Sequence, residues 1–266
     1  MVPSSFTCFR IYKNGQKIQG RLEKTRLNEL SAGEVVIKAH YSSINFKDAL
    51  AASGRAKIMR HFPLIGGIDL AGELVSSESP EFEVGQKVLV TGCGLGETSD
   101  GAYSEYVRVP ASWVLPLPDE LSPKEAMILG TAGFTAALCL ARLKANGQSP
   151  EQGPLLVTGA SGGVGMIAVQ ILSQQSFEVV AVSSKAEHHD LLRKLGACHT
   201  LTPQQLELDT TALSSARWAG AIDNVGGQLL SQIFPHIQLW GNIACVGMAG
   251  GSQLQTSIYP LILRGV

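Results

Sequence analysis

The stretch that decides the fold is 155–165, LLVTGASGGVG, in which an apolar run ends in a glycine-rich loop. Its first three residues are uninterrupted and apolar, which is typical of a strand buried on both faces of a parallel sheet. Three glycines follow from Gly159 with the spacing G-x-x-G-x-x-G, and the apolar run 164–172 predicts a helix. Strand, tight turn and helix N-terminus together favour a pyrophosphate site, because glycines admit the phosphates and the first N–H groups of a helix attract anions. The alternative is a glycine-rich turn without a ligand.

Downstream of this loop, strands alternate with helices, which predicts a doubly wound parallel sheet. The fourth and fifth predicted strands run into glycine, at Gly226 and Gly247. These turns are expected at the carboxyl edge of the sheet, where open α/β sheets bind ligands. The apolar stretch 259–266, YPLILRGV, stands where a sixth strand would begin, so we expect the sheet to be one strand short. Strands are predicted at 155–157, 179–183, 199–201, 219–223 and 243–246, and a helix at 188–195.

Upstream of the loop, the pattern is one of short strands separated by turn signals, without helices between most of them. This predicts a compact, barrel-like antiparallel β domain. A proline-containing connection at 115–118 is followed by Ser122, Pro123 and Glu125, which match the start of a helix. We therefore predict two domains, 1–118 and 119–266. The strands of the first are predicted at 6–12, 34–42, 68–75, 86–91 and 102–109.

Composition limits the possible partners and compartments of the 266-residue chain. The net charge of −1 and pI near 6.6 predict neither nucleic acid nor an anionic membrane surface as a partner. No apolar run reaches membrane-spanning length, and the first 15 residues lack the pattern of a signal peptide. The five cysteines are scattered singly and no histidine shows metal spacing, so neither a disulfide framework nor a metal site is expected. We expect a soluble cytoplasmic protein with a small-molecule substrate.

The residues after the second predicted strand of the sheet indicate which dinucleotide binds. NAD-binding proteins place a carboxylate there for the ribose hydroxyl, whereas this chain has Ser183, Ser184 and Lys185. Two hydroxyls and a cation suit a 2′-phosphate, so NADP(H) is favoured over NAD. The alternative is a solvated loop. Ser161, within the glycine loop, is predicted to contact phosphate.

Several motifs along nearly the whole chain resemble one known family. They are SSINFKDAL (42–50), FPLIGGIDLAGE (62–73), GTAGFTA (130–136), LGA (195–197), WAGAIDNVG (218–226) and MAGG (248–251). Together with the glycine loop they resemble the medium-chain dehydrogenase/reductase superfamily, and within it the zinc-free acryloyl-CoA reductase branch, also labelled YhdH/AcuI-type quinone oxidoreductase. The resemblance implies a GroES-like β-barrel domain, a Rossmann domain and NADPH in the cleft between them. It also implies reduction of a carbon–carbon double bond conjugated to a thioester.

The sequence supports the absence of zinc. Alcohol dehydrogenases of this superfamily hold catalytic zinc through a cysteine and a histidine beside a Gly-Glu pair, whereas the corresponding stretch here is 67–70, GIDL. No imidazole is present in that stretch to bind the metal. Without a Lewis acid, alcohol oxidation loses its means of stabilising an alkoxide, so reduction of an activated alkene fits better.

The resemblance also assigns catalytic residues. The motif that contains Asn45, Phe46 and Asp48 lines the nicotinamide cleft in the family, which implies that Asn45 and Asp48 are catalytic and that Phe46 contacts the cofactor. The alternative is structural, because Asn45 and Asp48 have the spacing of N-cap and N3 of a helix over 46–52. Phe46 replaces a tyrosine that is common in the family. If that hydroxyl supplies the proton, this protein uses water or another group.

The remaining site predictions concern the cofactor and the substrate. The basic cluster of Arg55, Lys57 and Arg60 is predicted to bind the phosphates of coenzyme A, the alternative being a solvated face. An arginine that the family places after the third strand is absent, which leaves Lys185 as the predicted cation for the 2′-phosphate. The predicted cofactor contacts are Phe46, Thr131, Ser161, Gly162, Gly163, Val164, Ser183, Ser184, Lys185, Gly247 and Met248.

Three functions are compatible with these residues. The first is NADPH-dependent reduction of the double bond of a short enoyl-CoA such as acryloyl-CoA. The second is an NADPH:quinone oxidoreductase. The third, from another class, is an inactive, truncated remnant that acts only as a binding protein. The exposed edge of a short sheet promotes association, so a homodimer is included among the expected partners.

Overall fold

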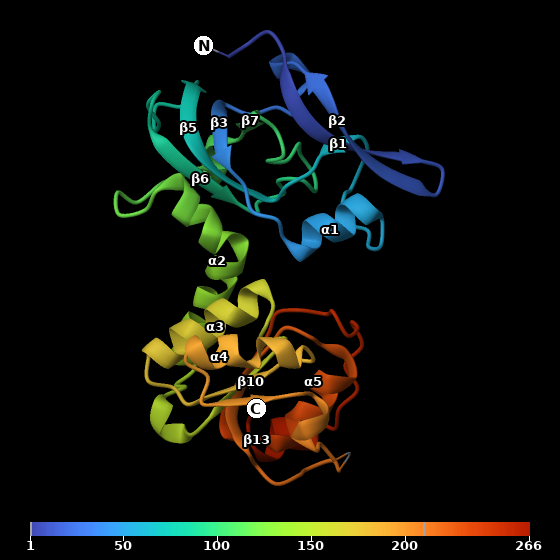
Figure 1. The fold of residues 1–266 in the computed structure, drawn as a ribbon, viewed down its shortest axis with the longest axis vertical. Coiled ribbons are helices and arrows are strands. Elements are labelled where there is room, and N and C mark those ends of the chain that lie inside the picture. Colours follow the sequence, from blue (N-terminus) through green and yellow to red (C-terminus); the bar gives the residue numbers. More distant parts are fainter. Residues whose placement is uncertain (1, 210) are drawn as a thin grey trace. The chain divides into compact units, whose positions relative to one another are not determined.

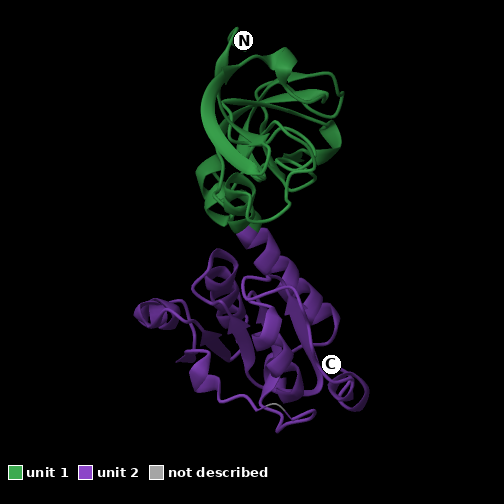
Figure 2. Cartoon of the chain, turned by 90° about the vertical axis from the view of Figure 1, so that its right-hand side faces the viewer, with its two compact units in different colours: residues 1–131 green, residues 132–266 purple. Residues whose placement is uncertain are grey.

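The computed structural model describes residues 2–209 and 211–266. The chain divides into two compact units, Met1–Thr131 and Ala132–Val266, coloured green and purple in Figure 2. Each unit has its own hydrophobic core and is described by itself. Figure 1 labels the elements of both.

The first unit contains a three-stranded antiparallel sheet in the order β2-β1-β4. Its strands are β1 (Phe6–Asn14), β2 (Lys17–Thr25) and β4 (Leu64–Ile65). Asn14 pairs with Lys17, so the predicted turn lies between β1 and β2, and Gly15 adopts the positive φ of 60° that such a turn needs. Strand β2 was not anticipated, because its sequence KIQGRLEKT is largely charged and polar.

The second sheet of this unit is five-stranded and antiparallel, in the order β7-β3-β5-β6-β8. Alternate side chains of its strands, including Val35, Ile37 and Leu70, are fully buried in one core. The predicted antiparallel β domain is confirmed. The strands are β3 (Val35–Tyr41), β5 (Asp69–Ser77), β6 (Lys87–Thr91), β7 (Tyr106–Val109) and β8 (Leu115–Pro116), and helix α1 (Phe46–Ser53) follows β3.

Helix α2 (Pro123–Ala145) contains the division between the units. It begins after Ser122 as predicted, but it is broken at Gly130, where φ is 49° and ψ is −153°. The sequence places the domain boundary at 118–119, whereas the contacts divide the chain at 131–132. The reason is that Ala126 and Met127 pack with Leu117 and Ala71 of the first unit.

Helix α2 is also long and apolar enough to cross a membrane by length and composition, contrary to the expectation that no such run exists. The break at Gly130 leaves 131–145 as its longest regular segment. That segment is about 22 Å long, shorter than a hydrocarbon core of about 30 Å. The helix is therefore weak evidence for a membrane span.

The second unit is built on a parallel sheet in the order β11-β10-β9-β12-β13, which confirms the predicted doubly wound arrangement. Leu155 and Val157 of the central strand pack in one core and Leu156 in another, so this strand is buried on both faces. The strands are β9 (Leu155–Thr158), β10 (Val179–Val182), β11 (His199–Leu201), β12 (Trp218–Asp223) and β13 (Ile237–Cys245), and the helices are α3 (Gly163–Gln174), α4 (His189–Lys194) and α5 (Gly227–Ile233).

Among the described residues this sheet has five strands, and the stretch predicted to begin a sixth forms helix α6 (Tyr259–Leu263) instead. Pro260 stands in the first turn of α6, where its fixed φ suits a helix. Arg264 then donates from Nη1 to the carbonyl oxygens of Pro235 and Ile237, at 2.6 and 2.9 Å. These bonds hold the segment beside β13. Short 3₁₀ turns complete the described chain at Leu27–Glu29, Ala111–Trp113, Pro150–Gln152, Ala186–His188, Gln204–Leu206 and Phe234–His236.

Candidate functional site

The glycine loop connects the central strand β9 to the N-terminus of α3. Gly159 adopts φ 56°, which turns the chain sharply at the end of the strand. A Cβ atom at Gly165 would lie 2.4 Å from the carbonyl oxygen of Gly159 and 2.6 Å from Cα of Ala160, so only glycine allows the helix to pack this closely. Gly162 and Gly163 are exposed. The loop is therefore shaped by glycine and open at its outer turn.

This loop fits an anionic group. The first N–H groups of a helix have no intrahelical acceptor, and in α3 they belong to residues at and just after Gly163. The N–H of Met166 donates to the carbonyl oxygen of Gly162, the N-cap residue, at 2.9 Å. Because Gly162 and Gly163 carry no side chain, a phosphate can reach these N–H groups closely. The predicted contacts at Ser161, Gly162, Gly163 and Val164 thus surround one helix N-terminus.

The end of β10 lies directly against the glycine loop. Ser161 Oγ and Ser183 Oγ are 2.8 Å apart and hydrogen-bonded, and Ser183 is only 2% exposed. The same Oγ of Ser183 accepts the main-chain N–H of Lys185 at 3.1 Å. Ser184 and Lys185 are exposed. Ser183 therefore shapes the turn, while Ser184 and Lys185 present their side chains to solvent.

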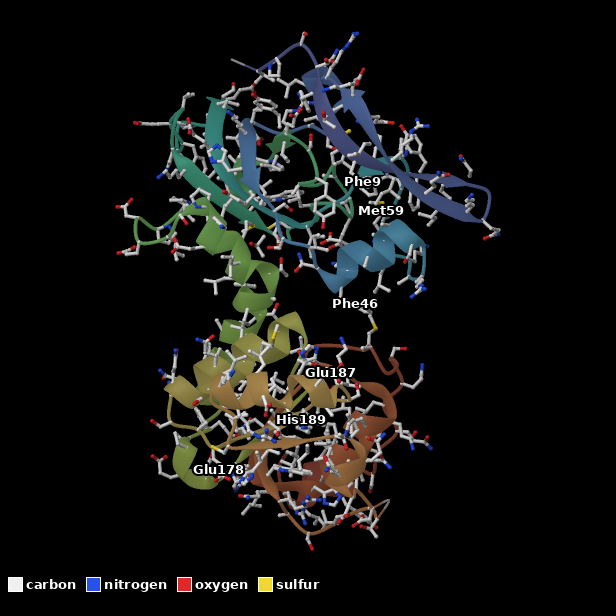
Figure 3. The ribbon with its side chains drawn as sticks, in the orientation of Figure 1. Phe9, Phe46, Met59, Glu178, Glu187 and His189 are labelled. Atoms are coloured by element: carbon white, nitrogen blue, oxygen red, sulfur yellow. The ribbon has the colours of Figure 1, made fainter. Side chains whose placement is uncertain are left out.

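His189, at the start of α4, was not among the predicted site residues. Its side chain is labelled in Figure 3, and its Nε2 lies 3.3 Å from the carbonyl oxygen of Ser183. Its spacing from the Ser183–Lys185 turn is the only signal that the sequence offered. The imidazole of His189, on α4, thus contacts the turn after β10 and stabilises it.

A buried carboxylate holds the neighbouring turn at the end of β12. Asp223 is fully buried and accepts hydrogen bonds from Thr158 Oγ1 at 2.5 Å and from the main-chain N–H of Gly226 at 2.6 Å. Its main-chain carbonyl accepts the N–H of Gly247 at 3.2 Å. A Cβ at Gly247 would lie 2.1 Å from the carbonyl oxygen of Asn224, so the turn after β13 must be glycine. The predicted residue Met248 follows and is 62% exposed.

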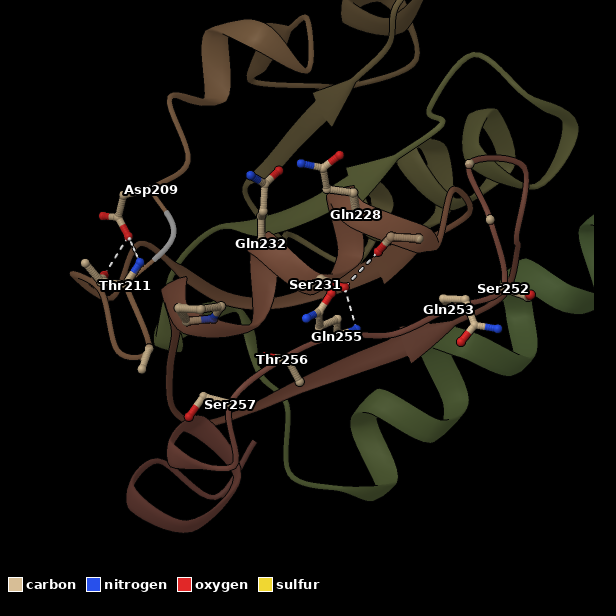
Figure 4. A pocket seen from close by; sticks show the side chains of 15 residues that line it. Asp209, Thr211, Gln228, Ser231, Gln232, Ser252, Gln253, Gln255, Thr256 and Ser257 are labelled. Atoms are coloured by element: carbon tan, nitrogen blue, oxygen red, sulfur yellow. Dashed lines mark hydrogen bonds between the residues drawn. The ribbon is translucent and has the colours of Figure 1, made fainter.

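The predicted cofactor residues of the second unit therefore follow the carboxyl ends of β9, β10 and β13, at one edge of one parallel sheet. A separate hollow of about 850 Å³ lies beside α5 and contains none of them. Its wall includes Gln228, Gln232 and Ser231, whose Oγ accepts the N–H of Gln255 at 2.9 Å (Figure 4). Asp209 also borders it, and hydrogen bonds from Ser214 and Thr211 lower the pKa of that carboxyl to about 2.

In the first unit, the candidate residues meet at a second buried carboxylate. Asp69, the first residue of β5, is fully buried. Its Oδ1 accepts the N–H of Ser43 at 2.9 Å, and its Oδ2 accepts Asn45 Nδ2 at 2.9 Å. The same Oδ2 accepts the main-chain N–H and the hydroxyl of Thr131, at 3.0 and 2.7 Å. Two predicted site residues, Asn45 and Thr131, thus share one partner that the predictions did not include.

The structural interpretation of the Asn45–Asp48 pair is also correct. Asn45 is the N-cap of α1 and forms a capping box with Asp48, whose Oδ2 accepts the N–H of Asn45 at 2.8 Å. Burial raises the pKa of the Asp48 carboxyl. Burial, and then the charge of Asp48, raise the pKa of Tyr103, whose hydroxyl donates to the carbonyl of Ser43 at 3.1 Å. Tyr103 is another member of the network that the sequence did not identify.

The remaining predicted residues of this unit are exposed. Phe46 is 67% exposed at the first position of α1 (Figure 3). Arg55, Lys57 and Arg60 all lie in the segment after α1 with exposed side chains, and within the described chain none of them forms a salt bridge. Their side chains are therefore available to an anionic ligand. Among the residues described, no three or more His, Cys, Asp and Glu side chains form a group that could hold a metal ion.

Comparison with known families and proteins gives consistent matches. Residues 31–119 match the family described as alcohol dehydrogenase GroES-like domain, and residues 163–266 match the family described as zinc-binding dehydrogenase. "Probable acrylyl-CoA reductase AcuI" of Escherichia coli is 45% identical over 245 residues, which cover 92% of this chain and 74% of that protein.

Two further relatives have solved structures. "Putative quinone oxidoreductase YhfP" of Bacillus subtilis is 45% identical over 98% of this chain and 79% of its own length. Its crystal structure with NAD bound matches with a TM-score of 0.95 over 99% of this chain and 80% of that one. The yhdH oxidoreductase of Salmonella enterica in complex with NADP matches with a TM-score of 0.94 and 42% identity, over 98% of this chain and 80% of that one.

Proposed function

Since the chain belongs to the medium-chain dehydrogenase/reductase superfamily, in the branch of the acrylyl-CoA reductases and YhdH-type quinone oxidoreductases, we propose that it reduces the double bond of a short enoyl-CoA thioester with NADPH. The similarity to the Escherichia coli reductase carries this proposal. Acrylyl-CoA, which would become propionyl-CoA, is the simplest such substrate.

NADPH is the proposed cofactor because the geometry of the second unit and the ligand of the Salmonella structure agree. The N-terminus of α3, with Ser161 to Val164, would hold the pyrophosphate. Ser184 and Lys185 would hold the 2′-phosphate, since they expose a hydroxyl and a cation at the turn after β10. Gly247, Met248, Thr131 and Phe46 are the further proposed contacts.

Asn45 and Asp48 are proposed to serve the reaction on the substrate. When bound, NADPH would supply the hydride that reduces the β-carbon. Negative charge then develops on the thioester oxygen, where an amide N–H donor stabilises it, and the α-carbon takes its proton from water. Asn45 can provide such a donor, and Asp48 fixes the main chain of Asn45 by accepting its N–H at 2.8 Å. No zinc ligand is proposed, which the stretch 67–70 supports because it offers no imidazole.

The basic cluster of Arg55, Lys57 and Arg60 is proposed to bind the phosphates of coenzyme A. Its exposed cations support this role, because each phosphate contact is a charge-assisted hydrogen bond. We also propose a cytoplasmic location, which is supported by five cysteines that are all unpaired.

The test is an acceptor screen with NADPH and NADH. We expect NADPH oxidation with acrylyl-CoA well above the rate with NADH. Replacement of Arg55 and Arg60 by alanine should raise KM for acrylyl-CoA and leave KM for the acryloyl thioester of N-acetylcysteamine unchanged, because that substrate has no phosphates. Absence of turnover with every short enoyl-CoA, in protein saturated with NADPH, would refute the proposal.

Quinone reduction is the second candidate, favoured by the name of the Bacillus relative. Benzoquinone and acrylyl-CoA at matched concentrations distinguish the two, because only the activity with acrylyl-CoA should depend on Arg55 and Arg60. Failure to bind NADPH at millimolar concentration would instead support a binding protein without activity.

A further inference from the structure

Asp69 is the residue of the first unit that links Ser43, Asn45 and Thr131 through hydrogen bonds. It lies between two apolar residues, Ile68 and Leu70, and none of its surface reaches solvent. A buried carboxylate is tolerated only where donors replace the water that it loses. Four donors do so here, two on main-chain nitrogens and two on the side chains of Asn45 and Thr131.

The chemistry of a carboxylate fixes the direction of these hydrogen bonds. Ionised carboxylate oxygens only accept, so the nitrogen and not the oxygen of the Asn45 amide faces Asp69. One hydrogen of Asn45 Nδ2 is given to Asp69. The amide is planar, so the direction of the second hydrogen on the same nitrogen is fixed as well. The partly exposed Asn45 is therefore held as a donor.

Asp69 also holds Thr131, the residue that follows the break in α2. Gly130 breaks this helix, and Asp69 accepts the N–H of Thr131, the first residue after the break. An anion at a helix N-terminus is favourable, because the N–H groups there lack partners and the helix dipole is positive. A Cβ on Gly130 would lie 2.2 Å from Ser43 Oγ, so the break needs glycine. The carboxylate thus fixes the positions of the Asn45 and Thr131 side chains relative to each other.

We infer that Asp69 is a positioning residue for the reaction, which holds the Asn45 amide with its N–H toward the substrate oxygen and holds the Thr131 hydroxyl in register with it. The inference rests on the proposed function for the identity of the substrate. It does not rest on that function for the orientation of Asn45.

The first test is Asp69→Asn, which preserves the shape but replaces one acceptor oxygen by an NH₂ group that faces an N–H donor in either orientation. We expect folded protein, NADPH affinity within about threefold of wild type, and kcat lower by about 100-fold, as when one donor to a developing oxyanion is lost. The side-chain amide signals of Asn45 in ¹⁵N–¹H spectra should shift, a readout independent of turnover.

The matched control is Asp100→Asn. Asp100 is a second buried aspartate of the same unit, 6% exposed, and it accepts hydrogen bonds from Ser31 and from the N–H of Ile65. Asp100→Asn and Asp69→Asn should lower the melting temperature to a similar extent, because each leaves a buried N–H donor without its acceptor. Asp100→Asn should leave kcat per NADPH-binding site and the Asn45 signals as in wild type.

The double variant Asp69→Asn/Asn45→Asp separates positioning from stability. It retains one charge and one hydrogen bond between the two residues, now donated by residue 69, but it removes the donor that faces the substrate. We expect the melting temperature to recover in part, because the N–H of Thr131 still faces the NH₂ group of residue 69, and kcat to remain low. Recovery of kcat in the double variant, or unchanged kcat and Asn45 signals in Asp69→Asn, would overturn the inference. If wild-type protein reduces neither acrylyl-CoA nor benzoquinone, the proposed function fails, and the Asn45 signals still decide the role of Asp69.

Discussion

Each of the two units contains a buried aspartate that is preceded by isoleucine, and the two carboxylates bind different groups. Asp69 begins β5 in the antiparallel sheet of the first unit, and Asp223 ends β12 in the parallel sheet of the second. Both are fully buried. Asp69 holds the side chains of Asn45 and Thr131 together with two main-chain N–H groups, whereas Asp223 holds the hydroxyl of Thr158 and the main chain of the next turn.

The difference shows two ways to build a site. In the second unit the surface offered to a ligand is main chain, so glycines create it and Asp223 keeps the turns in shape. In the first unit the surface offered is side-chain amide and hydroxyl, so the carboxylate must orient each group. We therefore expect changes around Asp223 to affect stability first, and changes around Asp69 to affect turnover first.

The largest expected effect is on the stability of the second unit. Asp223→Ala leaves Thr158 Oγ1 and the N–H of Gly226 without their buried acceptor, which should lower the free energy of unfolding by about 3 kcal/mol. Urea unfolding followed by tryptophan fluorescence, to which Trp218 in the same strand contributes, measures it. Asp190→Ala, on the exposed face of α4, is the control and should change the midpoint little. Equal midpoints for the two variants would contradict the role assigned to Asp223.

The second prediction tests whether glycine alone permits the loop geometry. Gly165→Ala places a Cβ 2.4 Å from the carbonyl oxygen of Gly159, so α3 must move away from the strand. We expect a loss of about 2 kcal/mol in stability and a marked loss of NADPH affinity, measured by urea unfolding and fluorescence titration. Gly163→Ala is the matched control for stability, because its Cβ would make ordinary contact at 3.4 Å from Ala132. Similar stability of the two variants would show that the loop tolerates displacement.

The features that could be predicted from sequence are those whose residues lie close together in the chain. The glycine loop and its strand were predictable because the signals are local: an apolar run, three spaced glycines and a helix pattern within one short stretch. The capping box of α1 was predictable for the same reason, since its two residues are three positions apart. Strand β2 was not, because its partner β1 rather than its own composition stabilises it.

The network around Asp69 could not be predicted, because its four members come from three separate parts of the chain. Ser43, Asn45, Asp69 and Thr131 meet only once β5 has paired and α2 has packed. Asp69 was noted only as part of the stretch 67–70, which lacks an imidazole. A charged residue within the apolar run 64–71 was the available signal, since a buried charge requires partners. The division by contacts at 131–132 differs from the predicted boundary because the packing of Ala126 and Met127 is likewise a tertiary feature.

The third prediction concerns the side chain of Lys185, in the turn after β10 of the second unit. Lys185 is exposed, and the turn that carries it is fixed by Ser183. Lys185→Ala should therefore weaken NADPH binding about tenfold and leave NADH binding and the melting temperature unchanged, because only the 2′-phosphate loses a charge-assisted hydrogen bond. Lys194→Ala, at the end of α4, is the control. Equal losses for NADPH and NADH would mean that Lys185 contacts another part of the cofactor.

The smallest expected effect compares the two segments of α2. The first is capped locally, by the N–H of Glu125 donating to Ser122 Oγ at 3.2 Å, whereas the second is capped by the distant Asp69. Ser122→Ala should lower the melting temperature by only a few degrees and leave kcat unchanged, because the cap is exposed and outside the network. Hydrogen bonds from Ser122 lower the pKa of Glu125 below its unfolded value. Their stabilisation is thus present above that unfolded pKa and is lost as the pH falls through the folded one, so the difference between wild type and variant should shrink below about pH 4. A loss of turnover in Ser122→Ala would break the distinction between local caps, which stabilise, and Asp69, which positions reacting groups.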